Sequence, residues 1–207
     1  MSESFVRLYL ASPLVTRADA FLPLLNAALA AGDVASLLLR LAEGADDETI
    51  RAVAAAAQPR DIALLLDGDS ERIARCGADG LQLPYEEKRL GAVLKRLHPD
   101  YIVGVGGLST RDDAMRAGEA GADYLLFGDD GAEGAPPPFD LLLERAAWWA
   151  ELFETPCVAL ARRLEEVGPL AASGAEFVMI GDAVWSDPRG PAEAMRDAMA
   201  RLAVEAS

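Results

Sequence analysis

Charged residues and glycines directly follow most of the short apolar runs in this sequence, at positions where they could bind ions. They are Arg40, Asp67, Asp69, Glu86, Glu87, Gly106, Gly107, Asp129, Asp130, Arg162, Arg163, Gly181 and Asp182. Carboxylates can hold Mg²⁺, which prefers one or two of them together with water and substrate phosphates. Arginines and backbone N–H groups can bind phosphate. The chemistry open to this set is therefore the binding of a small anion with a divalent cation.

Among the acids, Asp67 and Glu87 form the best pair of candidate magnesium ligands. Asp129 is a further candidate, and Asp182 is a weaker one. Helix N-caps also favour aspartate, so a purely structural N-cap role explains any single one of these acids equally well.

No residue is identified as catalytic. His98 is the only histidine, and it ends a helical pattern just before the next apolar run. This places it on the amino side of a strand rather than among the strand ends, so we do not expect it to act as a general base. Cys76 and Cys157 lie in unrelated contexts and are expected to be buried, inert thiols.

The apolar runs alternate with segments of helical spacing. Strands are expected at 7–12, 34–40, 62–66, 80–83, 101–105, 124–127, 157–161 and 177–180. Helical segments follow each of them, from 17–31 after the first strand to 188–204 at the end of the chain. Nearly uninterrupted apolar strands are typical of a parallel sheet covered on both faces.

A Gly-Ala-acid unit recurs at Gly77, Gly121 and Gly174, each time between a helical pattern and an apolar run. Glycine suits the left-handed residue just past the end of a helix. The unit therefore predicts three equivalent helix-to-strand turns in an alternating β/α chain.

Eight strand–helix units predict an α/β fold in which residues 1–207 form a single (β/α)8 TIM barrel domain. The right-handed crossover rule leaves an open doubly wound sheet as the alternative, and near-equal units favour the barrel. Barrel active sites lie at the carboxyl ends of the strands, so the charged strand ends should meet there. Phosphate normally binds after strands seven and eight, which points to Arg162 or Arg163 and the backbone at Gly181.

The net charge of −15 argues against nucleic acid or an anionic membrane as a partner. No apolar run reaches the roughly 18 residues of a membrane span. The first residues lack the basic region of a signal peptide, so a cytoplasmic location is expected. Trp148 and Trp149 suit packing or a subunit contact, which leaves a homodimer open. The irregular segment 128–138 has a length that is often functional or mobile.

Three stretches resemble the thiamine phosphate synthase/TenI family: GADGLQLPYEE from Gly77, YIVGVGGLSTRDDAMRAGEAGADYLLFGD from Tyr101 and SGAEFVMIGDAVW from Ser173. The resemblance extends from about Leu8 to Pro188. It implies a (β/α)8 barrel, and a reaction that joins a pyrimidine pyrophosphate to a thiazole phosphate. In that family the reaction uses Mg²⁺ and releases pyrophosphate.

Carried over position by position, the resemblance implies roles for five residues. Arg40 would bind pyrophosphate, as the surviving residue of a Gln-x-Arg-x-Lys motif. Asp67 and Glu87 would bind Mg²⁺, the first in place of the aspartate of an Asn-Asp pair and the second in place of an aspartate. Arg162 would contact the thiazole phosphate, beside the backbone of Gly181.

The sequence also departs from the family pattern. Leu38 and Ala42 replace the glutamine and lysine of the strand-2 motif, Gly106 replaces a serine, and Asp182 replaces a phosphate-binding serine. The Thr-x-x-Lys-type loop is absent from 128–138. Because each lost charge-assisted phosphate contact removes roughly 1.5–3 kcal/mol, weak pyrophosphate binding is predicted.

Three functions therefore stay open. The first is a divergent thiamine phosphate synthase that uses the residues above on small phosphorylated substrates. The second is a non-catalytic homologue that acts as a binding or partner protein. The third is an enzyme acting on a different small substrate, such as a cationic one. The acid–base histidine of TenI-type tautomerases has no counterpart among these strand ends.

Overall fold

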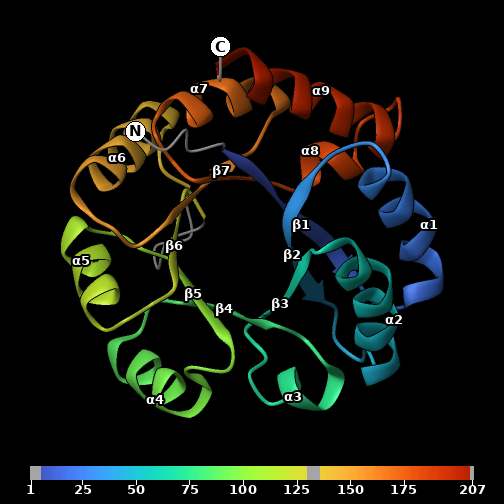
Figure 1. The fold of residues 1–207 in the computed structure, drawn as a ribbon, viewed down its shortest axis with the longest axis horizontal. Coiled ribbons are helices and arrows are strands. Elements are labelled where there is room, and N and C mark those ends of the chain that lie inside the picture. Colours follow the sequence, from blue (N-terminus) through green and yellow to red (C-terminus); the bar gives the residue numbers. More distant parts are fainter. Residues whose placement is uncertain (1–5, 130–135, 206–207) are drawn as a thin grey trace.

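The computed structural model describes residues 6–129 and 136–205, which form a closed barrel of parallel strands ringed by helices (Figure 1). The strands follow one another around the barrel in chain order, and β8 pairs with β1 to close it. The predicted TIM barrel is therefore confirmed, and the open sheet is excluded. Part of the irregular segment predicted at 128–138, including Asp130, lies outside the described residues.

The bounds of the elements agree closely with the predicted pattern. The strands are β1 (Arg7–Val15), β2 (Val34–Leu41), β3 (Ala63–Asp67), β4 (Gly80–Pro84), β5 (Ile102–Gly106), β6 (Tyr124–Phe127), β7 (Cys157–Ala161) and β8 (Phe177–Ile180). The helices are α1 (Ala18–Leu29), α2 (Asp47–Ala57), α3 (Ile73–Cys76), α4 (Glu87–Leu97), α5 (Arg111–Glu119), α6 (Phe139–Leu152), α7 (Val167–Ala172), α8 (Asp182–Trp185) and α9 (Pro191–Glu205), with 3₁₀ turns η1 (Gln58–Arg60) and η2 (Leu164–Glu166). None of the described helices is long and apolar enough to cross a membrane.

The largest differences from the predicted bounds lie at the start of the chain and after β8. β1 continues past Pro13, where the sequence predicts its end, and its register with β2 shifts between Ala11 and Leu14. Such an irregularity accommodates a proline, which has no N–H for the ladder. α1 runs through Pro23, within the helical segment predicted at 17–31. The four-residue helix α8 was not predicted, because one turn is too short to show a helical period.

The repeated Gly-Ala-acid unit has a shared structural role. Its glycines have φ values of 74°, 99° and 91°, the left-handed region predicted for a turn after a helix. Its acids each accept a hydrogen bond from a backbone N–H at the start of a neighbouring strand. These bonds join Leu64 to Asp79 (2.7 Å), Val103 to Asp123 (2.7 Å) and Cys157 to Glu176 (2.8 Å). The repeat therefore ties adjacent strands together at the amino end of the barrel.

The core has two layers, one inside the barrel and one between the sheet and the helices. Inside, the hydroxyl groups of Tyr9 and Tyr124 are hydrogen-bonded at 2.8 Å, and burial raises the pKa of both. Gly104 makes room for them, since a Cβ there would lie 2.0 Å from Cζ of Tyr124. Outside, Trp149 is buried and Trp148 packs against it. Packing accounts for this pair, and the homodimer stays a prediction.

Candidate functional site

A cavity of about 460 Å³ opens at the carboxyl ends of the strands, in the mouth of the barrel. Its apolar walls include Leu38, Leu126 and Met179, which also belong to the core inside the barrel. Charged side chains from strand ends and the loops after them line the rest: Arg40, Asp67, Asp129, Arg162 and Asp182. Residues from distant parts of the sequence therefore share one mouth, as a barrel requires.

Arg40 is the cation on the β2 side of the cavity. Its backbone N–H donates a 2.9 Å hydrogen bond to the hydroxyl of Ser12, a fully buried residue of β1. Its guanidinium lies 3.8 Å from Asp182 at the start of α8, as measured from Nη1 to Oδ1. The backbone of Arg40 is thus fixed by a buried partner, whereas its charged end makes only a loose contact with an exposed acid.

Asp67 ends β3 and points its carboxylate toward the cavity without a hydrogen bond to any described residue. Solvent reaches the side chain, yet the surrounding barrel atoms partly desolvate the carboxylate. This desolvation raises the pKa of Asp67, and the positive charge of Arg40 acts in the opposite direction. The carboxylate is therefore partly desolvated, and a cation bound beside it would stabilise its charged form.

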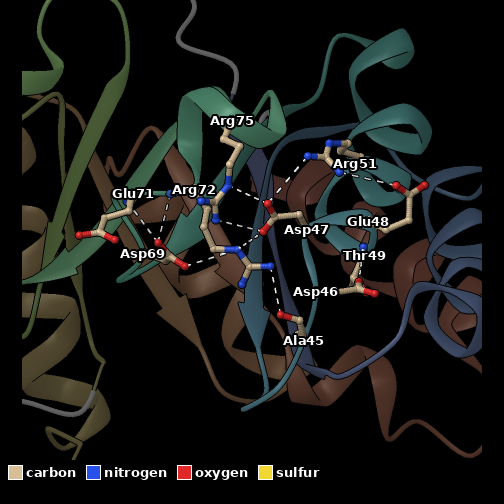
Figure 2. A network of polar contacts seen from close by, with 10 residues as sticks. All are labelled: Ala45, Asp46, Asp47, Glu48, Thr49, Arg51, Asp69, Glu71, Arg72 and Arg75. Atoms are coloured by element: carbon tan, nitrogen blue, oxygen red, sulfur yellow. Dashed lines mark hydrogen bonds and ion pairs between the residues drawn. The ribbon is translucent and has the colours of Figure 1, made fainter.

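The loop after Asp67 is held in place by an ion-pair network (Figure 2). Asp47, at the start of α2, contacts Arg72 at 2.8 Å and Arg75 at 2.7 Å, and Figure 2 shows it between these arginines and Arg51. Asp69 accepts hydrogen bonds from the backbone N–H groups of residues 71 and 72. Asp69 is therefore engaged in supporting the loop rather than in lining the cavity.

The carboxylate of Asp129 shapes the β5 side of the mouth. Asp129 accepts a 2.6 Å hydrogen bond from the backbone N–H of Gly107. Space for its carboxylate exists only because residue 106 is glycine: a Cβ on Gly106 would lie 2.2 Å from Oδ2 of Asp129. The neighbouring Gln82 on β4 is buried and lines the cavity, and its Oε1 has no hydrogen-bond partner among the described residues.

Sequence reasoning missed both Gln82 and Glu166 as site residues. Gln82 lies inside a strand, and its only signal is a polar residue within the apolar run of β4. Glu166 is buried and accepts backbone hydrogen bonds from Arg162 (2.7 Å) and Arg163 (3.3 Å). It also binds the Arg163 side chain at 3.0 Å. Of the two candidate arginines, Arg162 therefore lines the cavity, and Arg163 is engaged with Glu166.

The other residues considered in the sequence, Glu87, Gly181 and His98, differ in whether they line the cavity. Glu87 begins α4, where its Oε2 lies 3.6 Å from Nη1 of Arg116, and it is not part of the cavity lining. Gly181 is buried and does line the cavity. Nε2 of His98 lies 2.9 Å from Asp123, at the amino end of the strands, as expected for a residue outside the mouth. Within the described part of the chain, no three Asp, Glu, His or Cys residues are grouped closely enough to hold a metal by themselves.

This chain matches the family model described as "Thiamine monophosphate synthase" over residues 8–184. It is 39% identical over 196 residues to the thiamine-phosphate synthase of Rhodospirillum centenum, with 92% of this chain and 95% of that protein covered. It is 36% identical over 204 residues to the thiamine-phosphate synthase of Hyphomonas neptunium, with 92% and 90% covered.

Two solved structures share the fold. A thiamine phosphate pyrophosphorylase from Pyrococcus furiosus superposes with a TM-score of 0.79 at 17% identity, covering 98% of each chain. A 3-hexulose-6-phosphate synthase superposes with a TM-score of 0.74 at 19% identity, covering 94% of this chain and 99% of that one. At such low identity these likenesses support the barrel fold and say nothing about the substrate.

Proposed function

The chain belongs to the thiamine monophosphate synthase family, and we propose that its mouth cavity joins a pyrimidine pyrophosphate to a thiazole. The observation that carries this proposal is the placement of Arg40 and Asp67. They come from adjacent strands, line the same cavity, and interact electrostatically with each other. A cation and a partly desolvated carboxylate on adjacent strands suit a magnesium pyrophosphate, which offers a negative and a positive partner at once.

The proposed reaction makes few demands on acid–base groups. The thiazole nitrogen attacks the methylene carbon of the pyrimidine with its lone pair, and the carbon–oxygen bond to pyrophosphate breaks. The nitrogen carries no proton that must be removed, so a general base is not required. This fits a cavity whose lining contains no histidine among the described residues. Positioning and charge stabilisation then supply the catalysis.

The acids that line the cavity would stabilise the positive charge that develops in this reaction. The thiazole nitrogen becomes positively charged as the new carbon–nitrogen bond forms. Asp129 and Asp182 line the cavity and would stabilise that charge. We propose that the same acids reduce the affinity for anions, so the site balances pyrophosphate binding against stabilisation of the cationic product.

Among the side chains that line the cavity, Asp67 is the one best suited to bind Mg²⁺. Asp67 presents a carboxylate without a hydrogen bond to any described residue, and Mg²⁺ is commonly held by one or two carboxylates, water and substrate phosphates. When bound, the ion would neutralise charge on the pyrophosphate. We propose Asp67 as its protein ligand. Glu87 does not line the cavity and lies beside Arg116, so its role as a second ligand stays a prediction.

A different small substrate is the second candidate. Asp129 occupies the space beside Gly106, and Gln82 presents an unpartnered amide oxygen nearby. Such acceptors suit a ligand that donates hydrogen bonds or carries positive charge. A thermal-shift screen would separate this candidate from a non-catalytic homologue, because a specific ligand stabilises the folded state by mass action. The cytoplasmic location and the exclusion of nucleic-acid partners stay predictions.

Pyrophosphate release tests the proposed function. The purified protein is mixed with Mg²⁺, the pyrimidine pyrophosphate and a thiazole, with or without a phosphate group, and each component is omitted in turn. The proposal predicts release that needs both organic substrates and is strongly reduced in Arg40→Ala. Absence of release at high protein concentration with either thiazole would refute the reaction.

A further inference from the structure

We propose that Gln82 recognises the pyrimidine ring and selects rings that carry an amino group beside a ring nitrogen. The inference rests on the proposed function and adds a specificity-determining residue to it. It follows from the composition of the cavity wall. Among the described residues that line the cavity, Gln82 is the only one with a polar, uncharged side chain.

The amide of Gln82 is buried and only partly satisfied. The residue is 4% exposed, and its Oε1 has no hydrogen-bond partner among the described residues. A buried acceptor without a partner costs free energy until a donor reaches it. A leucine or a methionine would fill the same space without that cost. A ligand that donates to the amide therefore explains the glutamine better than packing does.

The strand register places Gln82 directly beside the proposed magnesium ligand. Gln82 on β4 pairs with Asp67 on β3, and adjacent strands lie about 4.8 Å apart. Asp67 is exposed whereas Gln82 is buried, so a substrate with its pyrophosphate near Asp67 would place its ring toward Gln82. The cavity residues Leu38, Leu126 and Met179 are also buried, and such apolar walls suit the faces of a flat ring.

The chemistry of a primary amide defines the ring edge that it fits. An amide offers an acceptor and a donor side by side, so its complement is a donor beside an acceptor. Glutamine binds the amino group and a ring nitrogen of adenine in this way. Oε1 of Gln82 would accept from the amino group, and Nε2 would donate to the ring nitrogen. The terminal torsion of glutamine is broad, so the amide can turn its oxygen toward the cavity when the ring arrives.

The neighbouring strand β5 leaves room for this amide. Gln82 pairs with Gly104 in the register, and a Cβ on Gly106 would lie 2.7 Å from Nε2 of Gln82. Asp129 also borders Gly106, but an ionised carboxylate only accepts, and this one already accepts from the N–H of Gly107. Of these two side chains, Gln82 is therefore the one that can pair with both the donor and the acceptor of the ring.

The test compares two pyrimidine pyrophosphates, one with the amino group and one with hydrogen in its place, at saturating Mg²⁺ and thiazole phosphate. We expect Gln82→Met to lower kcat/KM for the amino substrate by about tenfold or more, and to change kcat/KM for the hydrogen analogue much less. Comparing the preference of the variant with that of the wild type cancels the intrinsic reactivity of the two rings. Gln82→Leu serves as a second variant and should behave in the same way.

The matched control is Gln58→Met, at the only other glutamine of the chain. Gln58 donates to the carbonyl of Gly77 and to Asp79, away from the cavity. This variant should keep the substrate preference and have a lower Tm, because it loses two hydrogen bonds. Gln82→Met loses an amide with an unsatisfied oxygen, so its Tm without substrate should be equal to that of the wild type or higher.

The outcomes separate this inference from the proposed function. Absence of product from the amino substrate in the wild-type protein would refute the proposed function itself. An unchanged preference in both Gln82 variants would overturn the inference and leave the reaction standing. Equal losses for both pyrimidines would also overturn it, because they would place Gln82 at the shared magnesium pyrophosphate. A marked fall in Tm in both variants would assign the amide to the fold instead of the substrate.

Discussion

Nη1 of Arg40 lies 3.8 Å from Oδ1 of Asp182, so an arginine on β2 and an aspartate after β8 meet across the intervening strand β1. The arginine side chain is 36% exposed and the aspartate 82% exposed. Ion pairs this accessible to solvent contribute little to stability. Arg40 can therefore exchange Asp182 for a more highly charged anion at small cost, which is what a pyrophosphate-binding arginine requires.

Removal of the Arg40 side chain should reduce turnover without unfolding the protein. Arg40→Ala removes a charge-assisted contact to pyrophosphate, which contributes roughly 1.5–3 kcal/mol. The expected loss in kcat/KM is roughly ten- to a hundredfold. Steady-state pyrophosphate release measures it, with Arg7→Ala at the opposite end of the barrel as the control. Equal losses in the two variants would argue against a specific role for Arg40.

Asp67→Asn should stabilise the protein while it impairs function. Desolvation raises the folded-state pKa of Asp67, so the folded protein binds this proton more tightly than the unfolded chain does. Stability is therefore lost as the pH rises from the ordinary aspartate pKa through the raised one. The neutral asparagine avoids that loss. Thermal unfolding in the absence of Mg²⁺ should show a higher Tm for the variant at about pH 7 and a smaller difference at about pH 3.

The opposite order of those melting temperatures would contradict the proposed environment of Asp67. A second readout addresses its function: added Mg²⁺ with pyrophosphate should stabilise the wild type and have a much smaller effect on Asp67→Asn. Equal stabilisation of both proteins would remove Asp67 as the magnesium ligand.

Gly106→Ala should disturb Asp129 most and also Gln82, whose Nε2 would lie 2.7 Å from the added Cβ. The added Cβ would lie 2.2 Å from Oδ2 of Asp129, so the carboxylate must move away from the N–H of Gly107. Overpacking of this kind costs about 1–3 kcal/mol. In a double-mutant cycle measured by chemical denaturation, Asp129→Ala should relieve part of the cost. Additive effects of the two substitutions would show that the clash is not with Asp129.

The acids of the Gly-Ala-acid unit should matter for stability and not for activity. Asp79 accepts hydrogen bonds from the N–H of Leu64 at 2.7 Å and from Gln58 at 3.0 Å. Asp79→Ala should lower the free energy of unfolding by about 1.5–3 kcal/mol. Asp100→Ala serves as a control, because this exposed acid makes no side-chain hydrogen bond within the described residues. Similar unfolding energies for both variants would contradict the assigned role.

Much of the fold follows from local pattern. Short apolar runs separated by helical spacing predict the strands, and β6, β7 and β8 begin and end where predicted. The repeated glycines predict the turns. The predicted end of β1 at residue 12 was wrong, because the register shift that lets the strand continue past Pro13 depends on the neighbouring strand.

The site was predictable only in part. Arg40, Asp67, Arg162 and Gly181 lie at strand ends, and barrel geometry alone brings them to one mouth. The engagement of backbone amides by Glu166 is not visible in sequence, because it depends on how η2 folds back toward β7. The orientation of a side chain depends on such tertiary contacts, and no periodicity encodes them.

Calorimetric titration with magnesium pyrophosphate tests the central claim most directly, namely that Arg40 and Asp67 form a pyrophosphate site in the mouth of the barrel. The account predicts saturable binding to the wild-type protein and a roughly ten- to hundredfold weaker affinity in Arg40→Ala. Absence of binding to the wild type, or equal affinity in the two proteins, would contradict it.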